Sequence, residues 1–195
     1  MAYETKNFDG LLGIKGLSET LLKNHFTLYQ GYVTNTNKLA DALALSLKEG
    51  KTATPEFAEL KRRFAWEFNG MKLHEYYFGN ITKNSKAIDR NSNLSKNILA
   101  DFGSYENWEK DFRAMAAMRG IGWVVLYYDT QAKRLFNVWI NEHDAGHLAG
   151  GIPILVIDIF EHAYITDYGI KKADYIETFF KIIEWNIVSK ILYAA

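Results

Sequence analysis

The stretch that decides the fold is ILVIDIFEHAYITDYG, residues 154–169. An apolar run ends there at Asp158, and His162 follows four residues later. A carboxylate beside a buried strand loses its hydration, so it needs a cation or strong hydrogen-bond donors to stay ionised. If the chain turns helical after Asp158, the two side chains share one face. The pair is therefore compatible with a metal site and equally with an ion pair at a helix start.

The composition narrows the classes of protein to consider. The chain has 195 residues, enough for one large domain or two small ones that share a core. Lysine plus arginine and aspartate plus glutamate both number 23, so no overall field favours a nucleic acid or a membrane surface as partner. The absence of cysteine excludes disulfides, thiolate metal sites and cysteine nucleophiles, which leaves His, Asp and Glu as metal ligands. The chain shows neither a signal-peptide pattern nor an apolar run of membrane-spanning length, so we expect a cytoplasmic protein.

The N-terminal half predicts two long helices. Apolar residues recur at spacings of three and four over residues 17–45, and Gly31 within this pattern predicts a kink or close packing. Thr54 can cap a second helix that begins at Pro55 and runs to about residue 80. Because the connection between the two helices is short, we expect an antiparallel hairpin.

The C-terminal half has a different texture. A polar stretch, TKNSKAIDRNSNLS, predicts a linker at residues 82–95. The segments that follow predict helices over 94–102 and 105–118, strands over 122–129, 133–141 and 154–158, and one final helix over 172–192. The predicted fold class is α+β. A helical hairpin domain, residues 1–84, precedes an α+β domain, residues 85–195, with a small three-stranded antiparallel sheet.

The five histidines supply the candidate chemistry; they are His25, His74, His143, His147 and His162. The first two lie in the middle of neighbouring predicted helices, so their imidazoles could face each other across the hairpin. Together with Asp158 and His162 they would place a metal at the seam between the two halves, where pockets tend to form. The short HExxH signature is missing, and a buried polar cluster without metal remains the alternative.

Four stretches of the chain match one known family. DIFEHAYITDYG resembles the D-x-W-E-H-A-Y/F signature of iron/manganese superoxide dismutases. The stretches GMKLHEYYFGN, FGSYENWEKDFRAMAAMRGIGWVVLYYD and ADYIETFFKIIEW are similar to further motifs of that family, in the same order. The resemblance spans nearly the whole chain, is most specific over residues 102–185 and is weaker before residue 70. The fold of this family, a helical hairpin followed by an α+β domain, agrees with the texture described above.

The resemblance implies a function and a metal site. It implies that the chain converts two superoxide radicals to dioxygen and hydrogen peroxide through one iron or manganese ion per subunit. The implied protein ligands are His25, His74, Asp158 and His162, with a solvent molecule as fifth ligand. Asp158 would then be buried because the ion is its counter-charge. The sequence does not choose between iron and manganese.

The resemblance also implies roles for residues around the ion. Tyr32 corresponds to the tyrosine of the substrate funnel. His143 stands where many relatives have Gln, as the donor that tunes the bound solvent, and His147 is the less favoured candidate. His143 combined with Gly70 resembles a sub-group whose members use iron or accept either metal. The aromatic residues in the implied wall of the site are Trp123, Phe78 and Phe160.

Other matches concern the subunit interface. In the family, Glu161 bonds the ligand histidine of the partner subunit, which implies a homodimer or a dimer-based oligomer with Glu161 at the interface. The chain also departs from the pattern. The interval from His25 to Tyr32 is seven residues, one shorter than in relatives. Tyr29 and Ile165 stand near the places of the gateway histidine and its tyrosine partner.

Two other functions compete with the superoxide dismutase interpretation. One is a metal-dependent hydrolase that uses a zinc-bound hydroxide on a three-histidine, one-aspartate site. The other is a non-catalytic relative that keeps the fold as an interaction module. Metal content and a superoxide assay separate the three.

Overall fold

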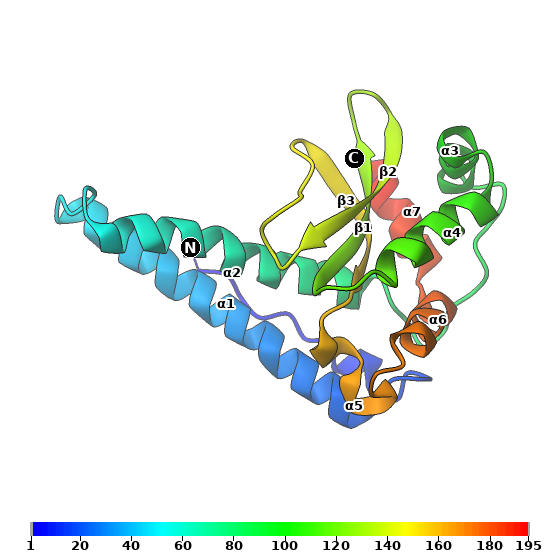
Figure 1. Ribbon diagram of the computed structural model, residues 1–195, viewed down its shortest axis with the longest axis horizontal. Helices are drawn as coiled ribbons and strands as arrows, with labels where there is room; N and C mark the ends of the chain where they lie inside the picture. The colour runs from blue at the N-terminus through cyan, green and yellow to red at the C-terminus, as the bar shows by residue number, and fades with distance from the viewer. Residues whose placement is uncertain (1, 195) are drawn as a thin grey trace.

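The computed structural model describes residues 2–194 and begins with a long helical hairpin (Figure 1). After a short 3-10 turn, η1 (Asp9–Leu11), helices α1 (Glu19–Lys48) and α2 (Pro55–Gly79) form its two arms. The Ser18 and Thr54 hydroxyls cap them by accepting backbone N–H bonds, and the cap at Thr54 is the one predicted above. The expected close packing at Gly31 is wrong. This residue is exposed, a Cβ there would meet no atom within 4 Å, and α1 continues through it.

The second half is an α+β unit with one antiparallel sheet, as predicted. Its strands are β1 (Gly122–Asp129), β2 (Arg134–Asn141) and β3 (Gly151–Asp158), in the order β2-β1-β3. Its helical elements are α3 (Asn93–Phe102), α4 (Tyr105–Ala116), η2 (Glu161–Ala163), α5 (Ile165–Tyr168), α6 (Lys172–Ile182) and α7 (Trp185–Ala194). In Figure 1 the sheet lies between the hairpin and the helices α3 and α4.

The sheet differs from the prediction at the start of β3. The strand begins at Gly151, three residues before the predicted start, and it includes Pro153. A proline is tolerated there because β3 is an edge strand, and the pairing with β1 shifts register between Leu126 and Tyr127. Beyond that shift, the register places Trp123 of β1 directly opposite Asp158.

The single final helix predicted over 172–192 is wrong. Ile183 has an extended backbone, with φ −63° and ψ 134°, and it pairs with Ile81 in an antiparallel bridge that separates α6 from α7. At the next residue, the Glu184 N–H donates to the Asn80 carbonyl at 2.7 Å. The two helices keep a common apolar period, so the sequence pattern alone does not reveal hydrogen bonds to the segment that follows α2. Helix α4 also ends at Ala116, two residues before the predicted end.

One side chain fixes the seam between the hairpin and the sheet. Asn80, the residue after α2, is fully buried. Its amide donates to the Ile154 carbonyl at 3.2 Å and accepts the Val156 N–H at 2.9 Å. The end of α2 is therefore tied to the middle of β3. The division of the chain at residues 84 and 85 into two domains stays a prediction. Within residues 2–194, none of the helices is both long enough and apolar enough to cross a membrane.

Candidate metal centre

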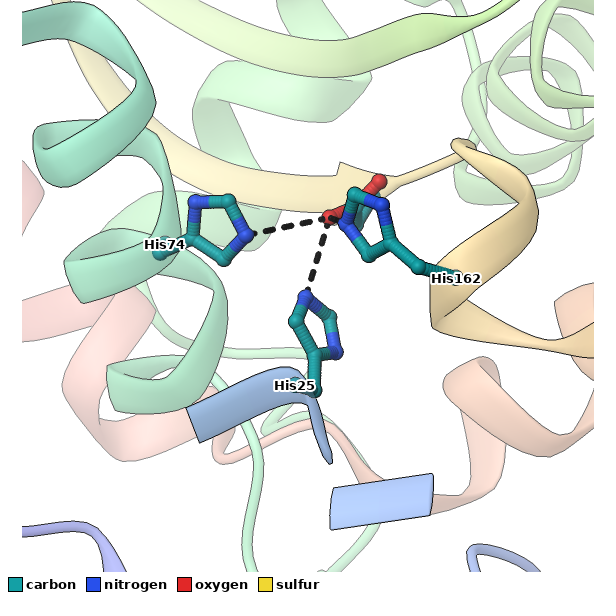
Figure 2. A group of neighbouring side chains, drawn as sticks. His25, His74 and His162 are labelled. Carbon is teal, nitrogen blue, oxygen red and sulfur yellow. Dashed lines mark hydrogen bonds and ion pairs between the residues drawn. The ribbon is translucent and has the colours of Figure 1, made fainter. Parts of the chain in front are cut away.

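The structure brings together four side chains from four different elements, and Figure 2 labels the three histidines among them. They are His25 of α1, His74 of α2, Asp158 at the end of β3 and His162 of η2. One ligand atom from each lies within 4.8 Å of those of the others. Asp158 Oδ2 is 3.1 Å from the Nε2 atoms of His25 and His162, and 3.7 Å from that of His74. Three imidazoles thus point their Nε2 atoms at one carboxylate oxygen.

The backbone around Asp158 holds its carboxylate in this orientation. Oδ1 accepts the Phe160 N–H at 2.8 Å, which leaves Oδ2 for the histidines. The Tyr175 hydroxyl donates to the Asp158 carbonyl at 2.8 Å. His162 comes back toward Asp158 through this turn and the single 3-10 turn η2. The pair therefore meets without the α-helical face that its spacing suggested.

The protonation states suit metal binding. Burial lowers the pKa of His25 and sets that of His74 well below its usual value. For Asp158, burial alone would raise the pKa, but the charges and hydrogen bonds of His162 and His25 outweigh it and hold the pKa well below its usual range. The site therefore offers neutral imidazoles at His25 and His74 and an ionised carboxylate at Asp158, the forms that ligate a metal ion.

His74 provides a test of whether the residues fit a metal ion. Its Nδ1 lies 2.6 Å from the Gly70 carbonyl, which can only accept, so Nδ1 carries the proton. The Nε2 lone pair then points at the cluster, fully buried and without a hydrogen-bond partner among the described residues. An unpartnered buried acceptor is costly, and an ion at the centre of the cluster would remove that cost. Three nitrogens and one carboxylate oxygen fit divalent and trivalent transition metals, iron and manganese included.

His143 lies beside this cluster in a chain of hydrogen bonds. It is fully buried, its Nδ1 accepts the Trp123 Nε1–H at 3.0 Å, and its Nε2 is 2.8 Å from the Tyr32 hydroxyl oxygen. Since the indole can only donate, the His143 proton sits on Nε2 and is donated to Tyr32. Burial lowers the pKa of His143 to about 4 and raises that of Tyr32. The Tyr32 O–H remains available as a donor.

His147 takes a different position. Its Nε2 lies 2.8 Å from the His143 carbonyl and its Nδ1 2.8 Å from the Tyr127 hydroxyl. It lines a surface cavity of about 580 Å³ together with Tyr127 and Leu148. His143 is thus the histidine that contacts Tyr32, whereas His147 contacts the backbone carbonyl of His143.

Aromatic rings surround the cluster. The ring of Trp123 is centred 4.9 Å from that of His74, and the ring of Phe78 is 4.9 Å from that of His25. Phe160 stacks on His143 at 4.7 Å and on His162 at 5.2 Å. Burial of this kind excludes water and strengthens every electrostatic interaction inside.

One glycine and one tryptophan on α2 also lie close to these side chains. A Cβ at Gly70 would lie 2.7 Å from Cδ1 of Tyr32, so the Tyr32 ring can occupy its place only beside a glycine. Trp66 was not singled out from the sequence, yet its ring is centred 4.4 Å from that of His143. It precedes His74 by eight residues, about two helical turns, and this common face is the signal that could have identified it.

Of the residues that the resemblance links to the subunit interface and the gateway, Glu161 and Ile165 lie at the surface and Tyr29 does not. Glu161 and Ile165 are exposed on the protomer. The His162 side chain is 23% exposed, and its Nδ1 has no hydrogen-bond partner within residues 2–194. Tyr29 does not point at the cluster, because its hydroxyl donates to Glu75 at 3.2 Å and accepts the Lys6 N–H at 3.0 Å.

Known proteins resemble this chain closely. The family model for the C-terminal domain of iron/manganese superoxide dismutases matches residues 90–191, more than half of the chain. The iron superoxide dismutase of Cupriavidus metallidurans is 40% identical over 179 residues, covering 89% of this chain and 87% of that protein. The iron enzyme of Aquifex pyrophilus is 35% identical, covering 91% of this chain and 84% of that protein. A manganese enzyme of Haloferax volcanii is 34% identical, covering 87% and 84% respectively.

Proposed function

Since the chain belongs to the iron/manganese superoxide dismutase family, whose members convert two superoxide ions and two protons to dioxygen and hydrogen peroxide, we propose that His25, His74, Asp158 and His162 hold its redox ion. The observation that carries this assignment is the convergence of four ligand atoms within 4.8 Å. His74 Nε2 adds to it, as a buried lone pair with no other described partner. A bound iron or manganese ion supplies the one-electron chemistry of both half-reactions.

The four proposed ligands set the charge that surrounds the reaction. Three neutral imidazoles and one carboxylate bring a single negative charge to the centre, which keeps the two oxidation states of an ion accessible. The Gly70 carbonyl fixes the His74 tautomer by accepting from Nδ1, and this contact raises the basicity of Nε2. The aromatic wall keeps bulk water away from these groups.

Tyr32 and His143 are our candidates for proton handling. Peroxide must take up two protons, and the Tyr32 O–H is a half-buried donor whose raised pKa keeps it protonated at neutral pH. The His143 Nε2–H holds the Tyr32 oxygen in place, and Trp123 in turn holds His143. We assign Tyr32 to orienting and protonating the reacting oxygen species, and His143 to tuning that donor.

We also propose a cytoplasmic homodimer, or an oligomer built from such dimers, with Glu161 at the interface. A metal-bound histidine normally donates its second N–H to a fixed acceptor. His162 Nδ1 is without such an acceptor among the described residues, and the neighbouring Glu161 carboxylate points outward. A two-fold axis would let each Glu161 accept from His162 of the partner subunit.

The test of the metal assignment is the variant Asp158→Ala. Protein reconstituted with iron or with manganese should carry about one ion per subunit and remove superoxide. The variant should lose the ion because three neutral imidazoles without the negative Asp158 carboxylate bind a divalent or trivalent ion less tightly. Asp41→Ala, an exposed carboxylate on α1, is the matched control. Full metal retention in Asp158→Ala, or hydrolase activity with zinc and no superoxide removal with iron or manganese, would contradict the proposal.

A further inference from the structure

The turn that carries His143 is closed by its own backbone. Asn141, the last residue of β2, and Ala145 exchange backbone hydrogen bonds at 2.7 and 3.3 Å, so His143 lies at the tip. Glu142, just before it, has a left-handed backbone with φ 49°. Residues other than glycine seldom adopt this conformation, and they keep it only where the surroundings hold them there.

Helix α2 supplies the side chain that holds this turn. The Trp66 Nε1–H donates to the Glu142 carboxylate at 3.1 Å, a bond between residues 76 positions apart. The same indole packs edge-on against His143, with the ring planes at 75°. The Arg63 guanidinium lies over the Trp66 ring at 3.8 Å, and Arg63 itself is ion-paired at 2.7 Å to buried Glu67. The indole therefore has a fixed place on α2.

We propose that Trp66 and Glu142 form a latch that positions His143 relative to Tyr32. The hydrogen bond of His143 to Trp123 fixes its tautomer and links it to the sheet, whereas Tyr32 belongs to the hairpin. The latch joins the sheet to the hairpin close to the bond between His143 and Tyr32, because it ties the turn after β2 to the helix that carries Gly70 and His74. The inference deepens the proposed function, since a longer bond from His143 to Tyr32 would weaken the control of the Tyr32 proton.

The position of the latch separates a positioning role from a structural one. Glu142 is exposed and the bond lies at the surface, where a single hydrogen bond contributes little to the free energy of unfolding. Losing the bond should therefore leave the fold and the metal content unchanged. Only the freedom of the His143 turn should increase.

The experiment measures solvent exchange of the His143 Nε2 proton by NMR in the metal-free protein, together with the reduction potential of the iron-loaded enzyme. Trp66→Phe keeps the ring and removes the donor. Glu142→Gly removes the acceptor without adding backbone strain, and Glu142→Gln restores an acceptor oxygen. We expect exchange about tenfold faster in Trp66→Phe and Glu142→Gly, near the original rate in Glu142→Gln, and a shifted potential in the first two only.

The controls decide between the outcomes. Glu106→Gln, an exposed carboxylate on α4 paired with Arg90, should change neither quantity. Unchanged exchange in Trp66→Phe would overturn the latch, and so would faster exchange spread over all core amides with a lowered melting temperature. The exchange measurement needs no metal, so it can fail or succeed independently of the metal assignment. A protein that binds neither iron nor manganese would refute the proposed function and leave the exchange result standing.

Discussion

Replacing Gly70 with alanine should move Tyr32 and leave the metal ligands in place. The added Cβ would lie 2.7 Å from Cδ1 and 2.8 Å from Cε1 of Tyr32, whereas ordinary contacts begin at 3.4 Å. The ring must therefore retreat by about 0.7 Å, at an overpacking cost of roughly 1–3 kcal/mol in the free energy of unfolding. The bond of 2.8 Å from His143 to Tyr32 would lengthen toward about 3.5 Å, where it no longer holds the hydroxyl.

The expected consequence is lower turnover at unchanged metal content. A displacement of this size costs about tenfold or more in a positioned reaction, since about 1 Å can cost up to 10²-fold. The assays are superoxide removal per bound ion and thermal unfolding of the metal-free protein. Gly79→Ala on the same helix is the matched control, because a Cβ there meets no atom within 4 Å. If Gly70→Ala keeps full turnover per ion and the control does too, the argument that Tyr32 needs this glycine is refuted.

Three further predictions concern the neighbours of the metal centre. His143→Gln should keep metal binding largely intact and shift the reduction potential, measured by redox titration; loss of the metal would count against an outer role for His143. In the metal-free protein the pKa of about 4 for His143, against 6.5 when unfolded, means that the unfolded chain binds more protons between these values. Stability should therefore fall by up to about 3 kcal/mol as the pH drops from about 6.5 to about 4, with His25 and His74 adding to the loss, and melts of His143→Gln should show a shallower slope. Glu161→Ala should give monomers or metal-poor protein with low activity, and an intact, fully metallated, active dimer in sedimentation would disprove the cross-subunit contact.

Much of the fold could be predicted because local chemistry and long-range packing agree. Ser18 and Thr54 mark the helix starts, and β-branched and aromatic runs mark the strands. The failures occur where distant partners override the local pattern. Ile183 is a helix-compatible residue that becomes extended because it pairs with Ile81, and no periodicity in residues 172–192 records that bridge. The early start of β3 likewise depends on the register shift beside Tyr127.

The proposed ligands could be named from the sequence because the resemblance to the family motifs implies them, but their surroundings could not. Trp66 of α2 packs against His143 in the turn after β2, and its place on the helix face of His74 puts it near the site without specifying this contact. The direction of the Tyr29 side chain also could not be predicted from the sequence. Its hydroxyl meets Glu75 and the N-terminal segment at Lys6, and only the packing of that segment against the hairpin decides this.

The short interval between His25 and Tyr32 has a simple geometric meaning. Seven residues are about two turns of a regular α-helix, so both side chains lie on one face of α1, about 10 Å apart along its axis. On α2, Gly70 and His74 are one turn apart and face α1. Gly70 therefore lies beside Tyr32, and His74 lies beside His25. The sheet adds Trp123 opposite Asp158 by its own register. The centre thus lies where the register of the two hairpin helices meets the register of β1 and β3. We therefore expect contacts between the hairpin and the sheet, such as that of His143 with Tyr32, to control the proposed proton donor.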